Sequence, residues 1–131
     1  MAGLIAIGVG CRKACPSEAI ATLVRSALAQ AGVREGERRL FTIEDKRGEA
    51  NLVDAARALG LELNFLAYDR LAAEAPRATT RSEQVERHIG LPSLAETAAL
   101  AGAGPGGALI VARLAADGAT CAIAYRPGVL S

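Results

Sequence analysis

The chain begins with an apolar run from Leu4 to Val9 that does not alternate with polar residues and is followed at once by Gly10. Such a run is typical of a β-strand that is buried on both faces, as the central strands of parallel sheets are. From Pro16 onward the apolar residues recur at helical intervals instead, and Gly32 ends the pattern. The first thirty residues therefore predict a central strand, a loop and a helix.

The same order of signals then returns. A strand is expected at Leu40–Ile43, a helix from about Asn51 to Leu59 with Gly60 as its stop, and a strand at Leu61–Leu66. Strands separated by helices predict a parallel βαβαβ unit with right-handed crossovers.

The second half of the chain predicts short helices and a hairpin. A brief helix is expected at Asp69–Ala75, and two capping boxes, Thr80 to Glu83 and Ser93 to Glu96, each predict the start of another. The turn residues Asp117-Gly118 separate two strand-like runs, 108–111 and 119–124. We therefore predict one α/β domain over residues 1–131: a small open mixed sheet with an N-terminal parallel βαβαβ unit, short helices and a C-terminal β-hairpin. The sequence leaves open whether the hairpin joins this sheet or forms its antiparallel edge.

Composition excludes several classes of protein. With 51% apolar and 22% charged residues the 131-residue chain is expected to be ordered and soluble. Its 15 Lys+Arg and 14 Asp+Glu give a net charge of +1, so no overall field attracts nucleic acid or an anionic membrane. Three cysteines and one histidine, His88, have no zinc-site spacing. We expect no metal, no cofactor, no membrane span and a cytoplasmic location.

Ligands of open parallel sheets bind beyond the carboxyl ends of the strands, which here selects the loops 8–15, 44–49 and 67–69. In the first loop, Gly8 and Gly10 would let the backbone approach an anion that Arg12 and Lys13 then bind. Such a charge-assisted hydrogen bond contributes ~1.5–3 kcal/mol in a dry site and ~0.2–1 kcal/mol when exposed. The alternative is an ordinary tight turn with solvated basic side chains.

The second loop holds three carboxylates, Glu44, Asp45 and Glu49, beside Lys46. Neighbouring carboxylates in a crevice shift each other's pKa and can divide acid and base roles between them. These three residues are the candidates for catalysis, and the alternative is a solvated turn.

Cysteine chemistry is the remaining candidate. Cys11 is the thiol nearest to basic neighbours, Arg12 and Lys13, which would favour its thiolate. No histidine partner is visible, so a packed, inert cysteine is the alternative. Cys15 is expected at the cap of the first helix and Cys121 in the core.

Taken in order, these motifs resemble the CobE family, the same unit as the C-terminal domain of CbiG. The resemblance rests on Gly8-Val9-Gly10-Cys11-Arg12-Lys13, Thr42-Ile43 with Asp45, Lys46 and Glu49, Ser82-Glu83 with Val85, Gly90 to Glu96 with Ala98-Ala99-Leu100, and Ala119-Thr120 with Ala122-Ile123-Ala124. It covers nearly the whole chain. Two positions depart from the family: Ala14 stands where glycine is usual, and Arg113 where lysine is common.

The resemblance implies a role in cobalamin biosynthesis, in which precorrins are rings fringed with carboxylates. It implies a binding site at Gly8, Gly10, Cys11, Arg12, Lys13, Thr42, Asp45, Lys46, Ser82 and Glu83. CbiG itself opens a lactone on the macrocycle, but only one of its domains corresponds to this chain, so that activity is not carried over.

Three functions remain as hypotheses. The first is a carrier or accessory factor that binds a precorrin-type tetrapyrrole in the aerobic pathway. The second is an enzyme that acts on the ring by hydrolysis or proton transfer. The third is a non-catalytic subunit that docks on another corrin-pathway enzyme. The first is preferred because no nucleophile and base can be paired from the sequence.

Overall fold

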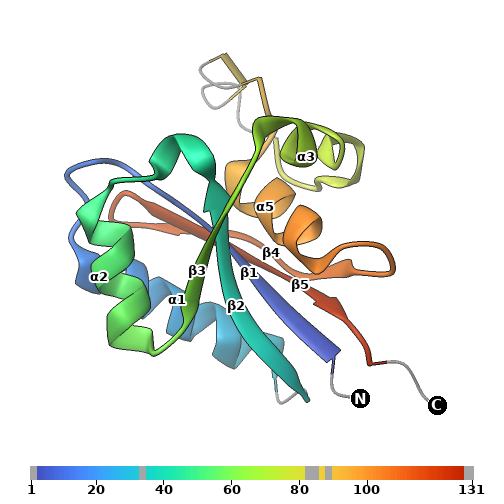
Figure 1. Cartoon of the computed structure of the whole chain (residues 1–131), viewed down its shortest axis with the longest axis horizontal. Coiled ribbons are helices and arrows are strands. Elements are labelled where there is room, and N and C mark those ends of the chain that lie inside the picture. The colour runs from blue at the N-terminus through green and yellow to red at the C-terminus, as the bar shows by residue number, and fades with distance from the viewer. Residues whose placement is uncertain (1–2, 33–34, 82–85, 88–89, 129–131) are drawn as a thin grey trace.

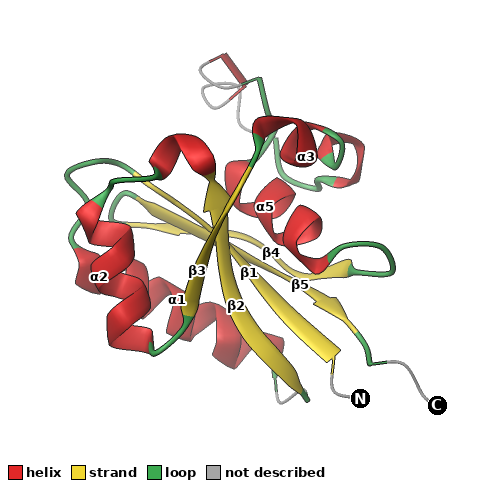
Figure 2. Cartoon of the chain, in the orientation of Figure 1, coloured by secondary structure: helices red, strands yellow, loops and turns green. Residues whose placement is uncertain are grey.

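A computed structural model describes residues 3–32, 35–81, 86–87 and 90–128. It shows a five-stranded mixed sheet in the order β3-β2-β1-β5-β4 with helices on both faces (Figures 1 and 2). The elements along the chain are β1 (Gly3–Cys11), α1 (Ser17–Ala31), β2 (Gly36–Ile43), η1 (Glu44–Lys46), α2 (Ala50–Leu59), β3 (Glu62–Leu66), α3 (Tyr68–Ala72), η2 (Ala75–Arg77), α5 (Leu94–Ala103), β4 (Ala108–Ala116) and β5 (Ala119–Arg126). The predicted open α/β architecture is confirmed.

Strand β1 lies at the centre of the sheet. It pairs in parallel with β2 and antiparallel with β5, so that Ile7 lies opposite Leu40 on one side and Ile123 on the other. Every residue of β1 after Gly3 is buried. This burial on both faces explains why the run 4–9 lacks the alternation of a surface strand.

The two faces of the sheet carry separate cores. Helices α1 and α2 cover one face, and α3 and α5 cover the other (Figure 1). Under α1 the core is built from large aliphatic side chains such as Ile7, Val24 and Leu52. Under α5 it is built mostly from alanines, among them Ala95, Ala98 and Ala99. Small residues let α5 lie directly on β1, where Gly8 faces the α5 backbone.

The C-terminal hairpin joins the same sheet and also forms its antiparallel edge. Strand β5 lies between β1 and β4, and β4 is the edge strand. Asp117 and Gly118 connect the two strands with φ values of 52° and 87°. Two consecutive residues with positive φ are what a two-residue hairpin turn of type I′ requires, and Asp-Gly is a favoured pair for it.

Some boundaries differ from the sequence prediction. Strand β2 begins at Gly36 instead of Leu40, because its first four residues are exposed or half-buried and lack an apolar signal, yet they pair with Gly3–Ala6 of β1. Helix α1 begins at Ser17 with Pro16 in the cap position, so Cys15 lies just before the cap. The helix expected from Thr80 falls mainly on residues outside the described ranges.

Glu96 is the buried charged residue that fixes the start of α5. Its backbone N–H donates to Ser93 Oγ at 3.1 Å, as the predicted capping box requires. Its carboxylate, however, does not return to Ser93. It accepts hydrogen bonds from the backbone N–H groups of Thr79 (2.7 Å), Thr80 (2.9 Å) and Arg113 (2.9 Å) and from the Thr79 hydroxyl (3.0 Å). Glu96 therefore joins three chain segments.

These bonds also set the ionisation of Glu96. Burial alone raises the pKa of its carboxyl group, but the hydrogen bonds from Arg113, Thr80 and Thr79 outweigh burial, and the pKa lies below its usual value. The Arg113 N–H is available for this role because the pairing of β4 with β5 shifts register between Val111 and Leu114.

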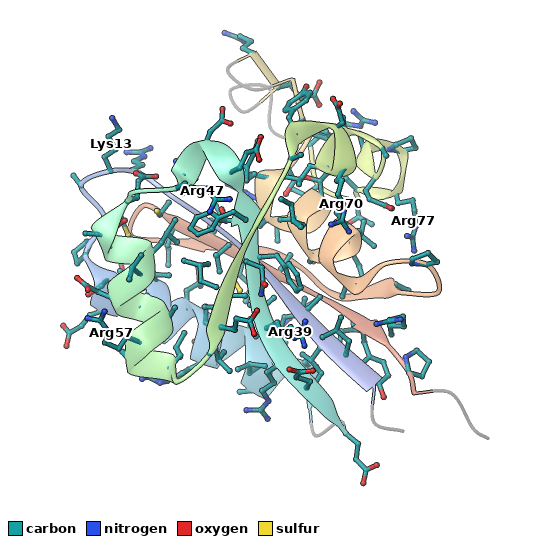
Figure 3. The ribbon with its side chains drawn as sticks, in the orientation of Figure 1. Lys13, Arg39, Arg47, Arg57, Arg70 and Arg77 are labelled. Atoms are coloured by element: carbon teal, nitrogen blue, oxygen red, sulfur yellow. The ribbon has the colours of Figure 1, made fainter. Side chains whose placement is uncertain are left out.

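The other end of α5 is held by arginines from elsewhere in the chain. The last turn of α5 carries no basic residue of its own. Arg70 of α3 donates to the Ala101 carbonyl at 3.0 Å, and Arg77 of η2 donates to the Gly107 carbonyl (Figure 3). Cations at the carboxyl end of a helix interact favourably with the negative end of its dipole.

Among the described residues, no helix combines the length and the apolar content that a membrane crossing needs.

Candidate functional site

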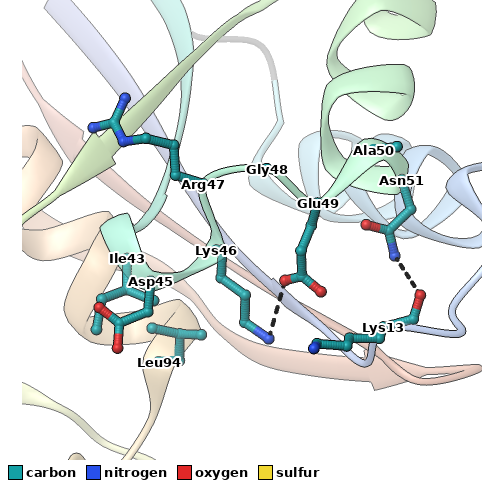
Figure 4. Close-up of a pocket in the computed structure, with 10 residues that line it drawn as sticks. All are labelled: Lys13, Ile43, Asp45, Lys46, Arg47, Gly48, Glu49, Ala50, Asn51 and Leu94. Atoms are coloured by element: carbon teal, nitrogen blue, oxygen red, sulfur yellow. Dashed lines mark hydrogen bonds and ion pairs between the residues drawn. The ribbon is translucent and has the colours of Figure 1, made fainter.

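A pocket of about 640 Å³ lies at the carboxyl ends of β1 and β2. It is lined by Lys13, Ile43, residues 45–51 and Leu94 (Figure 4). The loop after β1, the segment after β2, the first turn of α2 and the start of α5 therefore meet here. Two of the three loops that the sequence selects contribute to it. The third, 67–69, leads into α3 and does not line it.

Lys46 connects the two strand ends beneath this pocket. Its Nζ donates a hydrogen bond to the Cys11 carbonyl at 2.8 Å and lies 3.5 Å from Glu49 Oε2. Deeper in the sheet, the buried Thr42 hydroxyl donates to the Val9 carbonyl at 2.8 Å. Both contacts hold the end of β2 against β1, and Lys46 keeps its ammonium group at the pocket wall.

Asn51, to which the sequence assigned no role, fixes the loop that carries Lys13. Its Nδ2 donates to the carbonyls of Cys15 (2.9 Å) and Arg12 (3.2 Å), and it lies 3.4 Å from the Lys13 carbonyl. Its Oδ1 accepts from the Leu52 N–H at 2.9 Å. The signal was an asparagine in the first turn of a helix that follows a parallel strand, where a short amide side chain reaches nearby backbone groups.

Replacing Asn51 tests this clamp. We expect Asn51→Ala to lower the free energy of unfolding by about 1–3 kcal/mol, because loop carbonyls lose their donor, and to weaken any ligand that contacts Lys13. Asn51→Asp keeps the Oδ1 acceptor but removes the donors, so it should behave similarly. Asn64→Ala is a matched control that removes a single 3.2 Å bond to the Leu40 carbonyl. Equal denaturant midpoints for the Asn51 and Asn64 variants would contradict the clamp.

The two glycines of the predicted anion loop lie inside β1. A Cβ on Gly8 would run into the Ala95 carbonyl and come within 2.6 Å of Ala99 N, and one on Gly10 would lie 2.8 Å from Thr120 Oγ1. The space beside Gly8 is filled by the α5 backbone, and the space beside Gly10 is filled by the side chains of Thr120 and Leu94. The structure gives them a packing role beside any part in binding.

Of the predicted basic residues, Lys13 and Lys46 line the pocket and Arg12 does not. The Arg12 N–H donates to the Gly118 carbonyl at 3.0 Å, and its side chain lies beside the hairpin turn. Arg47 also lines the pocket, but its guanidinium lies 4.6 Å from the Phe65 ring centre and points away from Lys46 and Glu49 (Figure 4).

The predicted carboxylates are divided in the same way. Asp45 and Glu49 line the pocket, whereas Glu44 is exposed outside it. Ser82 and Glu83, which the resemblance places in the binding site, lie outside the described residues.

The cysteines are not poised for nucleophilic attack. Burial and the nearby Glu49 carboxylate raise the pKa of the Cys11 thiol to about 11, although Lys46 and Asn51 act in the opposite direction. Burial also raises the pKa of Cys15, with a contribution from Asp117, and that of Cys121 to about 12. A Cys11 thiolate is therefore disfavoured near neutral pH, and its burial agrees with the alternative of a packed, inert cysteine.

The chain contains two lysines, and both lie at the same pocket. Among 15 basic residues only Lys13 and Lys46 are lysines, and both line the same pocket. The first turn of α2 also faces it, and the side chain of Glu49 at its start makes no capping hydrogen bond. The two ammonium groups and the positive end of the α2 dipole thus converge on the pocket.

Comparison with known proteins identifies the family. The family model described as "Cobalamin synthesis G C-terminus" matches residues 5–124. The chain belongs to this family. Its membership confirms the resemblance stated from the sequence and places the chain among proteins of cobalamin biosynthesis.

Individual members of the family agree with the match. "Protein CobE" of Sinorhizobium sp. is 39% identical over 124 residues, which are 94% of this chain and 80% of that protein. The crystal structure of CobE, described as a protein from the cobalamin (vitamin B12) biosynthetic pathway, is 34% identical with a TM-score of 0.85 and covers 95% of this chain and 92% of its own. Cobalamin biosynthesis protein chiG of Agrobacterium tumefaciens str. C58 is 40% identical with a TM-score of 0.68, covering 92% and 96%.

Proposed function

We propose that this protein binds a precorrin-type tetrapyrrole polycarboxylate by its carboxylate fringe, as a carrier or accessory factor of cobalamin biosynthesis. The pocket of Lys13 and Lys46 is the binding site. The family supports the class of ligand, since the rings of this pathway carry acetate and propionate groups around their edge.

The observation that carries the proposal is that the only two lysines of the chain line one pocket. An ammonium group and a carboxylate form a charge-assisted hydrogen bond, which is about twice as strong as a neutral one. The adjoining first turn of α2 adds the positive end of a helix dipole. Several carboxylates on one ligand can use these groups together.

The volume and the lining of the pocket support binding of one edge of a macrocycle. Its volume of about 640 Å³ lies within the ~300–1,000 Å³ of small-molecule sites. Ile43 and Leu94 supply an apolar part of the wall, on which the hydrocarbon of the ring can rest. A ligand held by one edge keeps its other edge accessible, as transfer to a second protein requires.

A titration with a tetrapyrrole polycarboxylate tests the proposal. We expect uroporphyrin to bind with a shift of its absorbance spectrum, and its methyl ester, which lacks the charges, to bind far more weakly. Lys13→Ala should weaken binding about threefold to tenfold, the equivalent of losing a partly exposed charge pair. Added salt should weaken binding of the acid and leave the ester unaffected.

Arg57→Ala is the matched control for the loss of one positive charge. Arg57 is highly exposed at the opposite end of α2 from the pocket (Figure 3). Its replacement should leave the affinity within about twofold. If Lys13→Ala and Lys46→Met both bind as the unmodified protein does, the proposed site is wrong.

The scarcity of lysine allows a direct map of the contact. Acetic anhydride converts amines to stable amides, so within the sequence only Lys13, Lys46 and the terminal amine give this product. We expect bound uroporphyrin to slow acetylation of Lys13, as read by mass spectrometry, with the terminal amine as the internal reference.

One observation favours an enzyme as the second candidate. The Glu49 carboxylate lies in the pocket, and its Oε1 is buried without a hydrogen-bond partner among the described residues. A carboxylate held beside a ligand can act as a general acid or base. Formation of a new chromatographic species from the bound tetrapyrrole, lost in Glu49→Gln, would favour this candidate over the carrier.

A further inference from the structure

The pocket already contains a carboxylate of the protein itself. Glu49 Oε2 lies 3.5 Å from Lys46 Nζ, and Figure 4 shows the two side chains directed toward one another. Charge-assisted hydrogen bonds between such groups are usually ~2.7–2.9 Å long. The pair is therefore loose, although both side chains are largely buried, with 14% of Glu49 and 25% of Lys46 exposed.

The other oxygen of Glu49 is poorly placed. Oε1 is buried and accepts no hydrogen bond from the described residues. A buried carboxylate oxygen without a donor is unfavourable, and native structures rarely keep one without a reason. Glu49 also occupies the cap position of α2 without using its side chain to cap the helix. The side chain thus gives up solvation, and its one ion pair with a described residue is the loose contact with Lys46.

Lys13 offers a ligand a different first contact. It is exposed, and within the described residues it makes no ion pair. A ligand carboxylate can therefore reach Lys13 directly, whereas Lys46 is held by Glu49. The other carboxylate of the pocket wall, Asp45, makes no ion pair with either lysine.

We propose that the Glu49 carboxylate takes the place of a ligand carboxylate at Lys46, and that a carboxylate of the ligand displaces it from Lys46 when the ligand binds. This inference rests on the proposed function. A ligand carboxylate that pairs with Lys46 lies close to the charge of Glu49, so Glu49 must turn away from the ammonium group.

This arrangement selects for ligands with several carboxylates. A monocarboxylate gains only one partner and competes with a carboxylate that is already tethered to the site. A polycarboxylate anchored on Lys13 delivers its second carboxylate to Lys46 at a high effective concentration. Glu49 would thereby exclude small organic acids from a pocket whose charge otherwise suits them.

Removing the charge of Glu49 tests the inference with uroporphyrin as the probe. We expect Glu49→Gln to bind uroporphyrin about threefold to tenfold more tightly and to acquire measurable binding of acetate as a competitor. Without ligand, Lys46 should also be acetylated faster in this variant. Asp54→Asn is the matched control, because Asp54 is an exposed carboxylate one turn further along α2, and it should leave the affinity within about twofold.

The outcomes separate this inference from the proposed function. If Lys13→Ala weakens binding but Glu49→Gln binds equally or less tightly, Glu49 is not a competitor and only this inference fails. If Lys13→Ala and Lys46→Met leave the affinity unchanged, the site itself is wrong. Should Glu49→Gln fold poorly, Glu49→Ser removes the same charge and supplies a good helix cap, with the same expected tightening.

Discussion

Gly8→Ala is expected to destabilise the protein by about 3 kcal/mol or more, or to prevent folding altogether. The new Cβ would overlap the Ala95 carbonyl and lie within 2.6 Å of Ala99 N, both of them backbone atoms of α5. Extra atoms in a packed core usually cost ~1–3 kcal/mol when side chains can adjust. A helix backbone cannot rotate aside, so α5 would have to move away from β1 and open the core of that face.

Gly10→Ala is the matched control for this substitution. Gly10 lies in the same strand, two residues on, and its Cβ would meet only side chains, Thr120 Oγ1 at 2.8 Å and Leu94 Cδ2 at 3.1 Å. Side chains can shift by rotation, so we expect a smaller loss, read as the difference in thermal midpoint. Equal losses for the two variants would show that the close approach of α5 is not the constraint on Gly8.

Glu96→Ala is expected to lower the free energy of unfolding by about 3–5 kcal/mol. Glu96 is fully buried, and its carboxylate accepts from three backbone N–H groups and one hydroxyl. Each buried donor left without an acceptor costs about 1–3 kcal/mol, partly recovered where water can enter. The free energy of unfolding of a domain is usually ~5–15 kcal/mol, so the contribution of this single residue is a large fraction of it.

Glu96→Gln separates charge from shape. The amide keeps one oxygen acceptor, but its NH₂ group would face the Arg113 N–H or the Thr79 and Thr80 N–H groups, which are donors as well. We expect the free energy of unfolding of Glu96→Gln, measured with denaturant, to lie between those of the wild type and Glu96→Ala. Glu62→Gln, at an exposed position, should stay within about 0.5 kcal/mol of the wild type.

The same residue predicts a pH dependence. The pKa of Glu96 is lower in the folded protein than its ordinary value, so the folded state favours the ionised form. Its contribution to stability is therefore complete above the ordinary glutamate pKa of ~4.3 and is lost as the pH falls through the lower folded value. Glu96→Gln should flatten the acid side of the stability curve, and an unchanged curve would contradict this account.

The division of labour among the basic residues supports the choice of the pocket. Arg70 and Arg77 hold backbone carbonyls near the end of α5, and Arg47 covers an aromatic ring. These are contacts that suit a planar guanidinium with several donors. The two lysines, which carry compact point charges on flexible side chains, both lie in the wall of the pocket.

Part of the site could be predicted from the sequence alone. The rule that ligands bind at the carboxyl ends of parallel strands places the loops after β1 and β2 together, and the structure brings Lys13, Asp45, Lys46 and Glu49 to one pocket. The rule gives no side-chain directions. Arg12 lies beside the turn at Gly118 instead of in the pocket, and this turn is more than a hundred residues away in the sequence. The place of Asn51 in a first helical turn was a signal for backbone contacts, but its partners, the carbonyls of Arg12 and Cys15, are more than thirty residues away in the sequence.

Local patterns were enough to predict the succession of strands and helices along the chain, because the unbroken apolar run of β1 and the helical spacing of apolar residues involve only near neighbours. They also predicted the hairpin turn, since Asp117-Gly118 carries its own conformational preference. Three other features became visible only in the folded chain: Gly8 contacts α5, the Glu96 carboxylate binds Thr79, Thr80 and Arg113 instead of completing its capping box, and Glu49 reaches Lys46 with one oxygen unpaired. These three depend on distances between segments far apart in the chain, which packing sets and local propensity does not.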